Sequence, residues 1–318
     1  MAMTAALFIQ FLQMALVLAL APLLTGVVRK IKARLTRRRG ASVLQPYRDL
    51  ARLMRKEAVV AEAASWLFRF TPYIVFAATW IAAALVPTFA TDLVLGRSAD
   101  IIVIVALLGS ARFFLALAGL DIGTSFGGIG SSREMMIASL AEPAMLMIVF
   151  TLSLIAGTTQ LSAIAAYMQG GEVGIRVSLA LALVALIMVA IAENARIPVD
   201  NPATHLELTM VHEAMILEYS GRHLALIELA ASLKLVVYLS LLICIFLPWG
   251  VMGPEEGATA GAVAIALYAA KTLGGGALLG LFETSVAKMR VFRVGEFLSG
   301  ALLLGLLAVL LRFVSRSF

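Results

Sequence analysis

Eight apolar stretches dominate the sequence, and each is close to the roughly 20 residues that an α-helix needs to cross a bilayer. Of the 318 residues, 62% are hydrophobic and 14% are charged, whereas a water-soluble domain is about 25% charged. We therefore predict an all-α integral membrane protein, with one polytopic membrane domain over residues 1–318. The predicted spans are about 4–28, 71–90, 101–120, 137–157, 174–192, 224–248, 258–282 and 297–314.

Positive charge is distributed unevenly over the connections between these spans. Eleven Lys or Arg residues lie between Arg29 and Lys56, and the connections on that side carry 18 in all, against four on the other side. Because cytoplasmic connections carry the excess of Lys and Arg, we expect the long polar connections in the cytoplasm and both termini outside. The N-terminus lacks a basic segment before its long apolar stretch, which favours an uncleaved first span over a signal peptide.

The supply of metal ligands is small. Cys244 is the single cysteine and lies in an apolar run, so the chain builds no internal disulfide and no iron–sulfur cluster of its own. His205 and His212 would share a helix face, but the zinc pattern HExxH is absent after His212. We expect no metal and no cofactor in this chain.

The first polar connection is predicted to contain an amphipathic helix that follows Pro46 and lies in the membrane interface. Two interpretations remain open for it: contact with lipid headgroups, or a docking surface for a peripheral partner. Its apolar positions are Leu50, Leu53, Met54, Ala58 and Ala61, and its opposite face carries Arg48, Arg52, Arg55 and Lys56.

The second polar connection, GLDIGTSFGGIGSSRE at 119–134, is rich in glycine. It is not a dinucleotide-binding motif, because no strand precedes it. We expect a tight turn here, with Arg133 and Glu134 at the start of the next span.

The third polar connection begins with AENARIPVDNPATHLEL at 192–208. Pro198 and Pro202 cannot continue the preceding helix, which should end near 193–196. Thr204 and Glu207 have capping-box spacing, which predicts a new helix that runs to about Tyr219.

Ionisable residues also occur inside the predicted spans. A charge at membrane depth costs several kcal/mol and often belongs to a proton or ion path. Structural ion pairs and snorkelling side chains are the alternative interpretation. The residues are Arg112, Glu142, Glu228, Lys234 and Lys271.

The motif AENARIPVD…LEL…EYSG closely resembles the signature of the membrane subunit that joins the two arms of respiratory complex I and of group 4 NiFe-hydrogenases. Further similar stretches are RRGASVLQPYRDLARLMRKE at 38–57, GSSRE at 130–134 and MRVFRVGEFL at 289–298. Complex I members have Gly-Pro-Asn-Arg where this chain has Arg39 to Ser42, and more acids where it has Ala203 and His205. These departures indicate the hydrogenase branch, which includes the formate hydrogenlyase and hydrogenase-4 membrane subunits.

The resemblance implies a non-catalytic subunit that links an electron-transfer arm to proton or ion translocation in a bacterial or archaeal inner membrane. Nickel–iron and iron–sulfur centres would be in its partners, namely hydrogenase-like large and small subunits and an iron–sulfur subunit, beside antiporter-like membrane subunits. Alternatives are a complex I quinone-site subunit, a metal-free hydrogenase relative, and an independent transporter. The implied coupling residues are Glu142, Glu193, Glu207, Glu218, Glu228, Lys234 and Lys271; the implied arm-docking residues are Arg39, Arg133, Arg196, Asp200, His205, Arg290 and Arg293.

Overall fold

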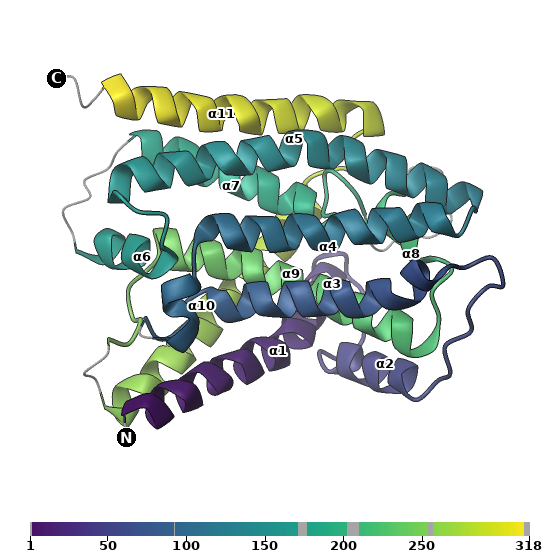
Figure 1. Cartoon of the computed structure of the whole chain (residues 1–318), viewed down its shortest axis with the longest axis horizontal. Helices are drawn as coiled ribbons and strands as arrows, with labels where there is room; N and C mark the ends of the chain where they lie inside the picture. The colour runs from purple at the N-terminus through teal and green to yellow at the C-terminus, as the bar shows by residue number, and fades with distance from the viewer. Residues whose placement is uncertain (1, 92, 171–176, 202–209, 254–256, 315–318) are drawn as a thin grey trace.

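The computed structural model describes residues 2–91, 93–170, 177–201, 210–253 and 257–314. The described chain is predominantly helical, as predicted (Figure 1). Its α-helices are α1 (Ala2–Leu35), α2 (Gln45–Met54), α3 (Trp66–Leu85), α4 (Ile101–Asp121), α5 (Ser125–Ala156), α6 (Leu161–Gln169), α7 (Val177–Glu193), α8 (His212–Ile216), α9 (Gly221–Phe246), α10 (Ala258–Ser285) and α11 (Val294–Val314), with 3₁₀ turns η1 (Val94–Ser98) and η2 (Val291–Arg293).

Seven of the described helices are long and apolar enough to cross a membrane. The remaining predicted span, the fifth at 174–192, corresponds to α7, an apolar helix of 17 described residues; its predicted start at 174 lies outside the described residues. The protein is therefore a multi-pass membrane protein. The second span begins earlier than predicted, at Trp66, because the Ser65 hydroxyl caps the helix by accepting from the Leu67 N–H at 3.1 Å.

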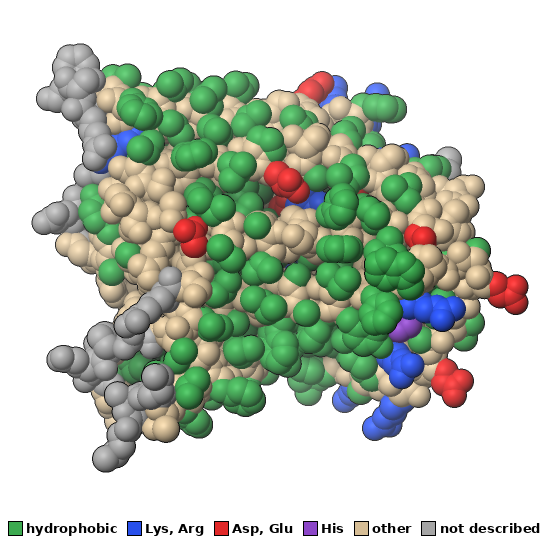
Figure 2. Space-filling view, viewed as in Figure 1, with side chains coloured by type: hydrophobic (Ala, Val, Ile, Leu, Met, Phe, Trp, Pro, Cys, Tyr) green, Lys and Arg blue, Asp and Glu red, His purple; other side chains and the backbone are tan. Residues whose placement is uncertain are grey.

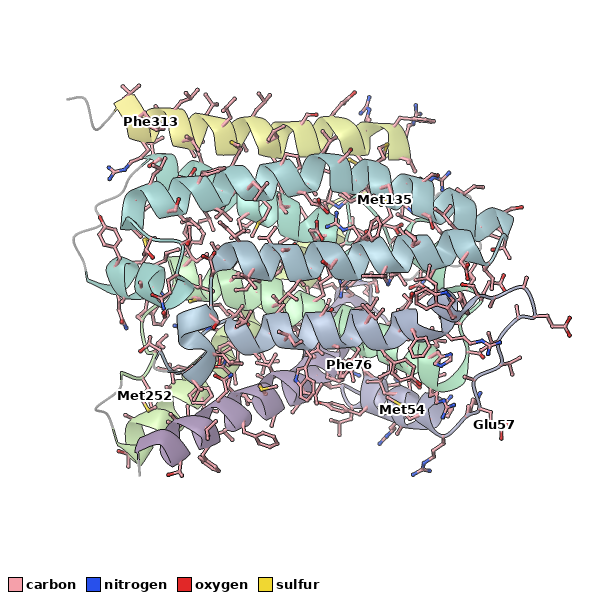
Figure 3. The ribbon with its side chains drawn as sticks, in the orientation of Figure 1. Met54, Glu57, Phe76, Met135, Met252 and Phe313 are labelled. Atoms are coloured by element: carbon pink, nitrogen blue, oxygen red, sulfur yellow. The ribbon has the colours of Figure 1, made fainter. Side chains whose placement is uncertain are left out.

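The long helices lie side by side in one bundle (Figure 1). Helix α11 packs on α5 and α7 along one edge, α3 packs between α4 and α9, and α1 packs with α9 and α10 along the opposite edge. The start of α1 and the end of α11 lie at the same end of the bundle. Met54 and Glu57 of the first polar connection lie at the other end, opposite Met252 and Phe313 (Figure 3).

Two buried glutamines of α1 satisfy carbonyls at the end of α3. Gln10 donates to the Ala84 carbonyl at 3.0 Å, and Gln13 donates to the Val86 carbonyl at 2.9 Å. The last carbonyls of a helix have no partner within the helix. Side chains from α1 therefore supply hydrogen-bond donors to the Ala84 and Val86 carbonyls at the end of α3.

The amphipathic helix in the first connection is shorter than predicted. Helix α2 ends at Met54, so Ala58 and Ala61 lie beyond it. The chain after α2 instead pairs with the start of α9, where the Val59 N–H donates to the Ser220 hydroxyl at 2.8 Å. Gly221 has a φ of 52°, and a Cβ there would lie 2.3 Å from the Glu57 carbonyl oxygen, so only glycine permits this approach.

The glycine-rich connection is largely helical, and the predicted start of the next span at Arg133 is wrong by about two turns. The turn is confined to 122–124, and α5 begins at Ser125, with the Thr124 hydroxyl accepting from the Gly127 N–H at 3.3 Å. The glycines allow α5 to touch its neighbour: a Cβ on Gly127 would lie 2.2 Å from the Gly119 carbonyl oxygen of α4. Close helix approach in membranes uses small residues in this way.

We expect Gly127→Ala to destabilise the protein by about 1–3 kcal/mol, because the added methyl group collides with the α4 backbone. The matched control is Gly128→Ala, where an added Cβ meets no atom within 4 Å. Thermal unfolding of the detergent-solubilised protein distinguishes the two variants. Equal unfolding temperatures would show that α4 and α5 do not depend on this contact.

Candidate functional site

The end of α7 is a sharp turn that directs charged side chains inward. Ala195 has a φ of 48°. The Arg196 N–H donates to the Ile191 carbonyl at 3.0 Å, and the Ala195 N–H donates to the Ala192 carbonyl at 3.1 Å. These paired bonds form a Schellman motif, in which a left-handed residue ends the helix. The helix ends at Glu193, within the predicted range.

Glu193 lies in a buried ion cluster that we call the central cluster: Arg112, Glu134, Glu142, Glu193 and Lys234. Arg112, with a side chain 3% exposed, contacts the Glu193 carboxylate directly. Its Nε lies 3.5 Å from Glu134 Oε1, and Lys234 Nζ lies 2.9 Å from Glu193 Oε2. Four helices, α4, α5, α7 and α9, therefore meet through charges at membrane depth.

The central cluster opens to the side of the bundle through Glu142. This side chain is 47% exposed, and its Oε1 lies 3.9 Å from Arg112 Nη1. It lies in a groove of about 570 Å³ between α4 and α5, whose floor includes Gly109 and Arg112 and whose rim is mainly apolar. Glu142 is thus the member of the cluster with access to the exterior.

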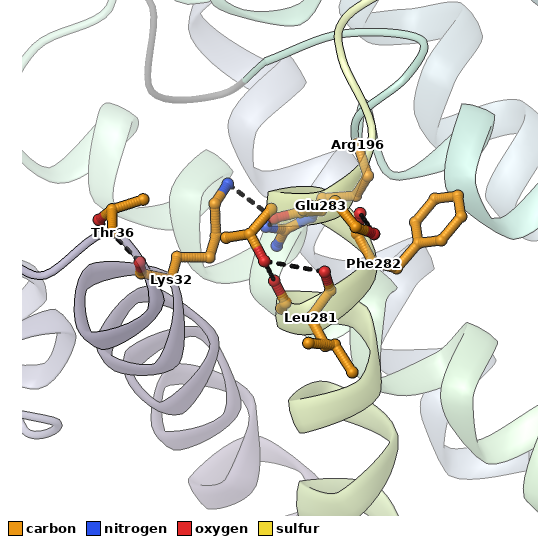
Figure 4. Close-up of polar contacts among 9 residues, drawn as sticks. Lys32, Thr36, Arg196, Leu281, Phe282 and Glu283 are labelled. Carbon is orange, nitrogen blue, oxygen red and sulfur yellow. Dashed lines mark hydrogen bonds and ion pairs between the residues drawn. The ribbon is translucent and has the colours of Figure 1, made fainter.

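A second buried ion cluster, the α1–α10 cluster, consists of Lys32, Arg196 and Glu283 (Figure 4). The Glu283 side chain has no exposed surface; its Oε2 lies 2.7 Å from Lys32 Nζ and its Oε1 lies 3.6 Å from Arg196 Nη1. Burial lowers the pKa of the Arg196 guanidinium, and the nearby Glu283 carboxylate opposes that shift. Removal of Glu283 would leave two cations without this counter-charge.

Asp200 ties the third polar connection to the last one. Its carboxylate accepts from Lys288 Nζ at 3.2 Å, from the Val211 N–H at 3.2 Å and from the Asn201 N–H at 2.8 Å. Arg133 of α5 donates to the Met210 carbonyl at 3.0 Å. The described residues at both ends of the third polar connection are therefore held by charge-assisted hydrogen bonds, which are stronger than neutral ones.

The predicted helix up to Tyr219 is wrong in its extent: α8 covers only His212–Ile216. Tyr219 instead leaves the helix to stack on Phe68 at 3.9 Å between ring centroids, and its hydroxyl donates to the Phe68 carbonyl at 3.0 Å. Burial raises the pKa of Tyr219. The proposed capping box and the pair of histidines involve Thr204, Glu207 and His205, which lie outside the described residues.

The remaining predicted site residues lie apart from the two clusters. Lys271 lies near the end of α9, where it donates to the Leu247 carbonyl at 2.8 Å and lies over the Trp249 ring at 4.0 Å. The residues with exposed side chains are Glu218, Glu228, Arg39, Arg290 and Arg293. Among the described residues, no three of His, Cys, Asp and Glu are arranged to hold a metal ion.

Sequence reasoning missed three members of these clusters, namely Glu134, Glu283 and Lys32. Glu134 was expected only as the start of a span, although it is eight positions before Glu142 and so lies on the same helix face. Glu283 is separated from Lys32 by most of the chain, and no spacing pattern connects them. Arg112 was recognised as an intramembrane charge, but its three carboxylate partners were not.

The sequence matches the NADH dehydrogenase family over residues 7–314. The chain belongs to this family. Formate hydrogenlyase subunit 4 of Escherichia coli is 36% identical over 282 residues, which cover 88% of this chain and 90% of that protein. Hydrogenase-4 component C of Escherichia coli is 36% identical over 75% of this chain and 74% of its own length.

Complex I subunits are also similar, at lower identity. NADH-quinone oxidoreductase subunit 8 of Rhodothermus marinus is 29% identical over 86% of this chain and 80% of that protein. A chain of the membrane-bound sulfane sulfur reductase, an archaeal respiratory membrane complex, has the same fold, with a TM-score of 0.83, 17% identity and coverage of 97% of this chain and 99% of that one. The predicted family and its hydrogenase-side relatives are thus confirmed.

We expect Glu283→Gln to lower the free energy of unfolding by about 3–5 kcal/mol, because it removes the one carboxylate that pairs with both Lys32 and Arg196 inside the bundle. Thermal unfolding in detergent measures the loss. Glu296→Gln is the control, since this exposed glutamate lies at the same end of the bundle. Similar stability of both variants would contradict a structural role for the α1–α10 cluster.

Proposed function

We propose that this protein is the membrane anchor and coupling subunit of an energy-converting group 4 NiFe-hydrogenase complex of the formate hydrogenlyase type. The two hydrogenase-side relatives share 36% of their aligned residues with this chain, against 29% for the complex I subunit. The lost Gly-Pro-Asn-Arg motif and the reduced set of acids in the third connection support the same branch.

The observation that carries this proposal is the central cluster, in which five charges from four helices meet at membrane depth. A bundle that only anchored a partner would be as stable, or more stable, with apolar residues there. The central cluster is connected along the chain to the third polar connection, because Glu193 of the cluster and Arg196 of the connection are three residues apart. A change of charge in a docked redox partner would therefore act on the loop, on Arg196 and on the cluster in turn.

The coupling acids in this proposal are the ones that accept and release protons as the partner is oxidised and reduced. Lys234 is the cation next to Glu193, and Lys271 would lie toward the outer side. The coupling residues are Glu142, Glu193, Glu207, Glu218, Glu228, Lys234 and Lys271, and the residues facing the docked arm are Arg39, Arg133, Arg196, Asp200, His205, Arg290 and Arg293.

The partners in this proposal hold the redox centres. They are hydrogenase-like large and small subunits with the nickel–iron centre, an iron–sulfur subunit, and antiporter-like subunits beside this chain in a bacterial or archaeal inner membrane. Both termini would lie on the outer side, since the positive connections are at the opposite end of the bundle.

Purification in mild detergent tests the proposal, with mass spectrometry of the co-purifying subunits and metal analysis of the complex. We expect nickel, iron and a hydrogenase-like large subunit. Iron without nickel would indicate instead the hydrogenase relative whose large subunit holds no nickel–iron centre. A flavin-containing module that oxidises NADH would indicate a complex I subunit. A chain that purifies alone and moves ions in vesicles would indicate a transporter.

We expect Glu142→Gln to leave the complex assembled but to reduce proton translocation in inverted vesicles by about tenfold or more, because the amide cannot accept a proton. The electron-transfer rate of the same vesicles is measured in parallel. Glu62→Gln, a change to an exposed glutamate of the first connection, is the control and should keep normal translocation. Coupled turnover in the Glu142→Gln variant would exclude this residue from the path.

A further inference from the structure

The start of α2 contacts the apolar part of α1. The Tyr47 hydroxyl donates to the carbonyl of Ala19 in α1. Ala19 precedes Arg29, the first cation of α1, by ten residues, or about 15 Å of helix. The chain before α2 is equally close to α1, because a Cβ on Gly26 would lie 2.0 Å from the Val43 carbonyl oxygen. The Tyr47 side chain in the first turn of α2 thus reaches the apolar part of α1, well before the first cation of that helix.

Four cations follow on the same helix and its C-terminal cap. They have positions i, i+4, i+7 and i+8, which are neighbours on a helix surface. They surround the small residue Ala51 and border an open hollow of about 540 Å³, whose lining side chains are all exposed. In the part of the chain that the structure describes, Asp49 is the acid paired with them, at 3.0 Å from Arg52. The cations are Arg48, Arg52, Arg55 and Lys56.

The surroundings of the hollow place it at the boundary between hydrocarbon and water. Lys and Arg side chains gather at this end of the molecule beside a hydrophobic flank (Figure 2). Trp66, Phe70 and Tyr73 on the first turns of α3 are 70%, 57% and 45% exposed, and aromatic residues of this kind mark the membrane interface. Met54 of α2 is also exposed. We infer from these aromatic residues and cations at one end of the bundle that the headgroup layer lies near the four cations.

We propose that this hollow is a binding site for the phosphate of an anionic lipid headgroup. Guanidinium groups bind phosphate oxygens bidentately, and the four adjacent cations exceed the one paired acid, Asp49, by three charges, so one or two headgroup phosphates neutralise part of the surplus. The acyl chains would extend past Tyr47 along the apolar part of α1 and the exposed apolar residues next to it. An acidic peptide of a partner would satisfy the charges but not the apolar flank, so the lipid fits both features.

The site is attached to the start of α9. Three residues after Lys56, Val59 pairs with Ser220 at the start of α9. The Ser220 hydroxyl donates to the Val59 carbonyl at 2.9 Å. Gly221 lies against the Lys56 and Glu57 carbonyls. Because Glu228 and Lys234 are on the same helix, a bound headgroup would steady the end of α9 that carries them.

The test is lipid binding by the complex that co-purifies with this chain, after removal of native lipid. Native mass spectrometry with phosphatidylglycerol, and with phosphatidylcholine as the neutral comparison, gives the affinity of each. In the triple variant Arg52→Gln/Arg55→Gln/Lys56→Gln we expect the affinity for phosphatidylglycerol to fall by about 10- to 100-fold. The matched control removes the same charge from exposed positions outside the hollow, as Arg34→Gln/Arg38→Gln/Arg69→Gln, and should change the affinity by less than about threefold.

Three outcomes would overturn the proposal. An equal loss in the control variant would mean that the cations attract lipid through overall charge and not through a site. Displacement of phosphatidylglycerol by millimolar inorganic phosphate would assign the hollow to a free anion. Unchanged lipid binding with loss of a subunit from the triple variant would assign it to a protein partner. None of these depends on whether the complex contains nickel, so the proposed function is tested separately.

Discussion

A charge buried in a membrane protein requires a counter-charge close to it, and the segment from Glu193 to Asp200 supplies three such charges in succession. Glu193 pairs with cations of α4 and α9, Arg196 with a carboxylate of α10, and Asp200 with Lys288. Their separations of three and four residues across the turn direct each one to a different neighbour. The positions of α7, α9 and α10 at the end of the bundle that carries the polar connections all depend on this segment.

These ion pairs need helices that approach closely, and small residues make that approach possible. Gly109 of α4 faces Glu142, whose Oε1 would lie 3.4 Å from an added Cβ. Gly119 and Gly127 bring the loop ends of α4 and α5 together, which is the end where Arg112 reaches Glu134. A larger residue at the Gly119–Gly127 contact would separate the helices and weaken the ion pair. The glycine-rich connection is therefore part of the architecture of the central cluster as well as a turn.

Hydropathy was sufficient to predict the existence of the spans, but not their ends. The second span begins at Trp66 because Ser65 caps it and also donates its N–H to Asp121 at 2.9 Å, a contact with a distant residue that no local pattern contains. The prolines and charges of the third connection were sufficient to predict that its acids are candidate functional residues at the end of a helix. Glu283 could not, because its meaning depends on Lys32, which is brought near only by the packing of α1 on α10.

The central cluster and the α1–α10 cluster have net formal charges of opposite sign. The central cluster has three carboxylates and two cations, so one added proton would bring its formal charge to zero. The α1–α10 cluster has one carboxylate and two cations, so it carries one positive charge in excess. Glu193 and Arg196 join these opposite imbalances through a single helix turn. A negative charge in a docked partner near Arg196 would offset the excess positive charge of the α1–α10 cluster. The carboxylates of the central cluster would then be less stabilised by that positive charge and would bind a proton more readily. In the proposed coupling, Glu142 would be the acid that receives this proton, because Glu193 is already paired with both Arg112 and Lys234, whereas Glu142 is half exposed in its groove.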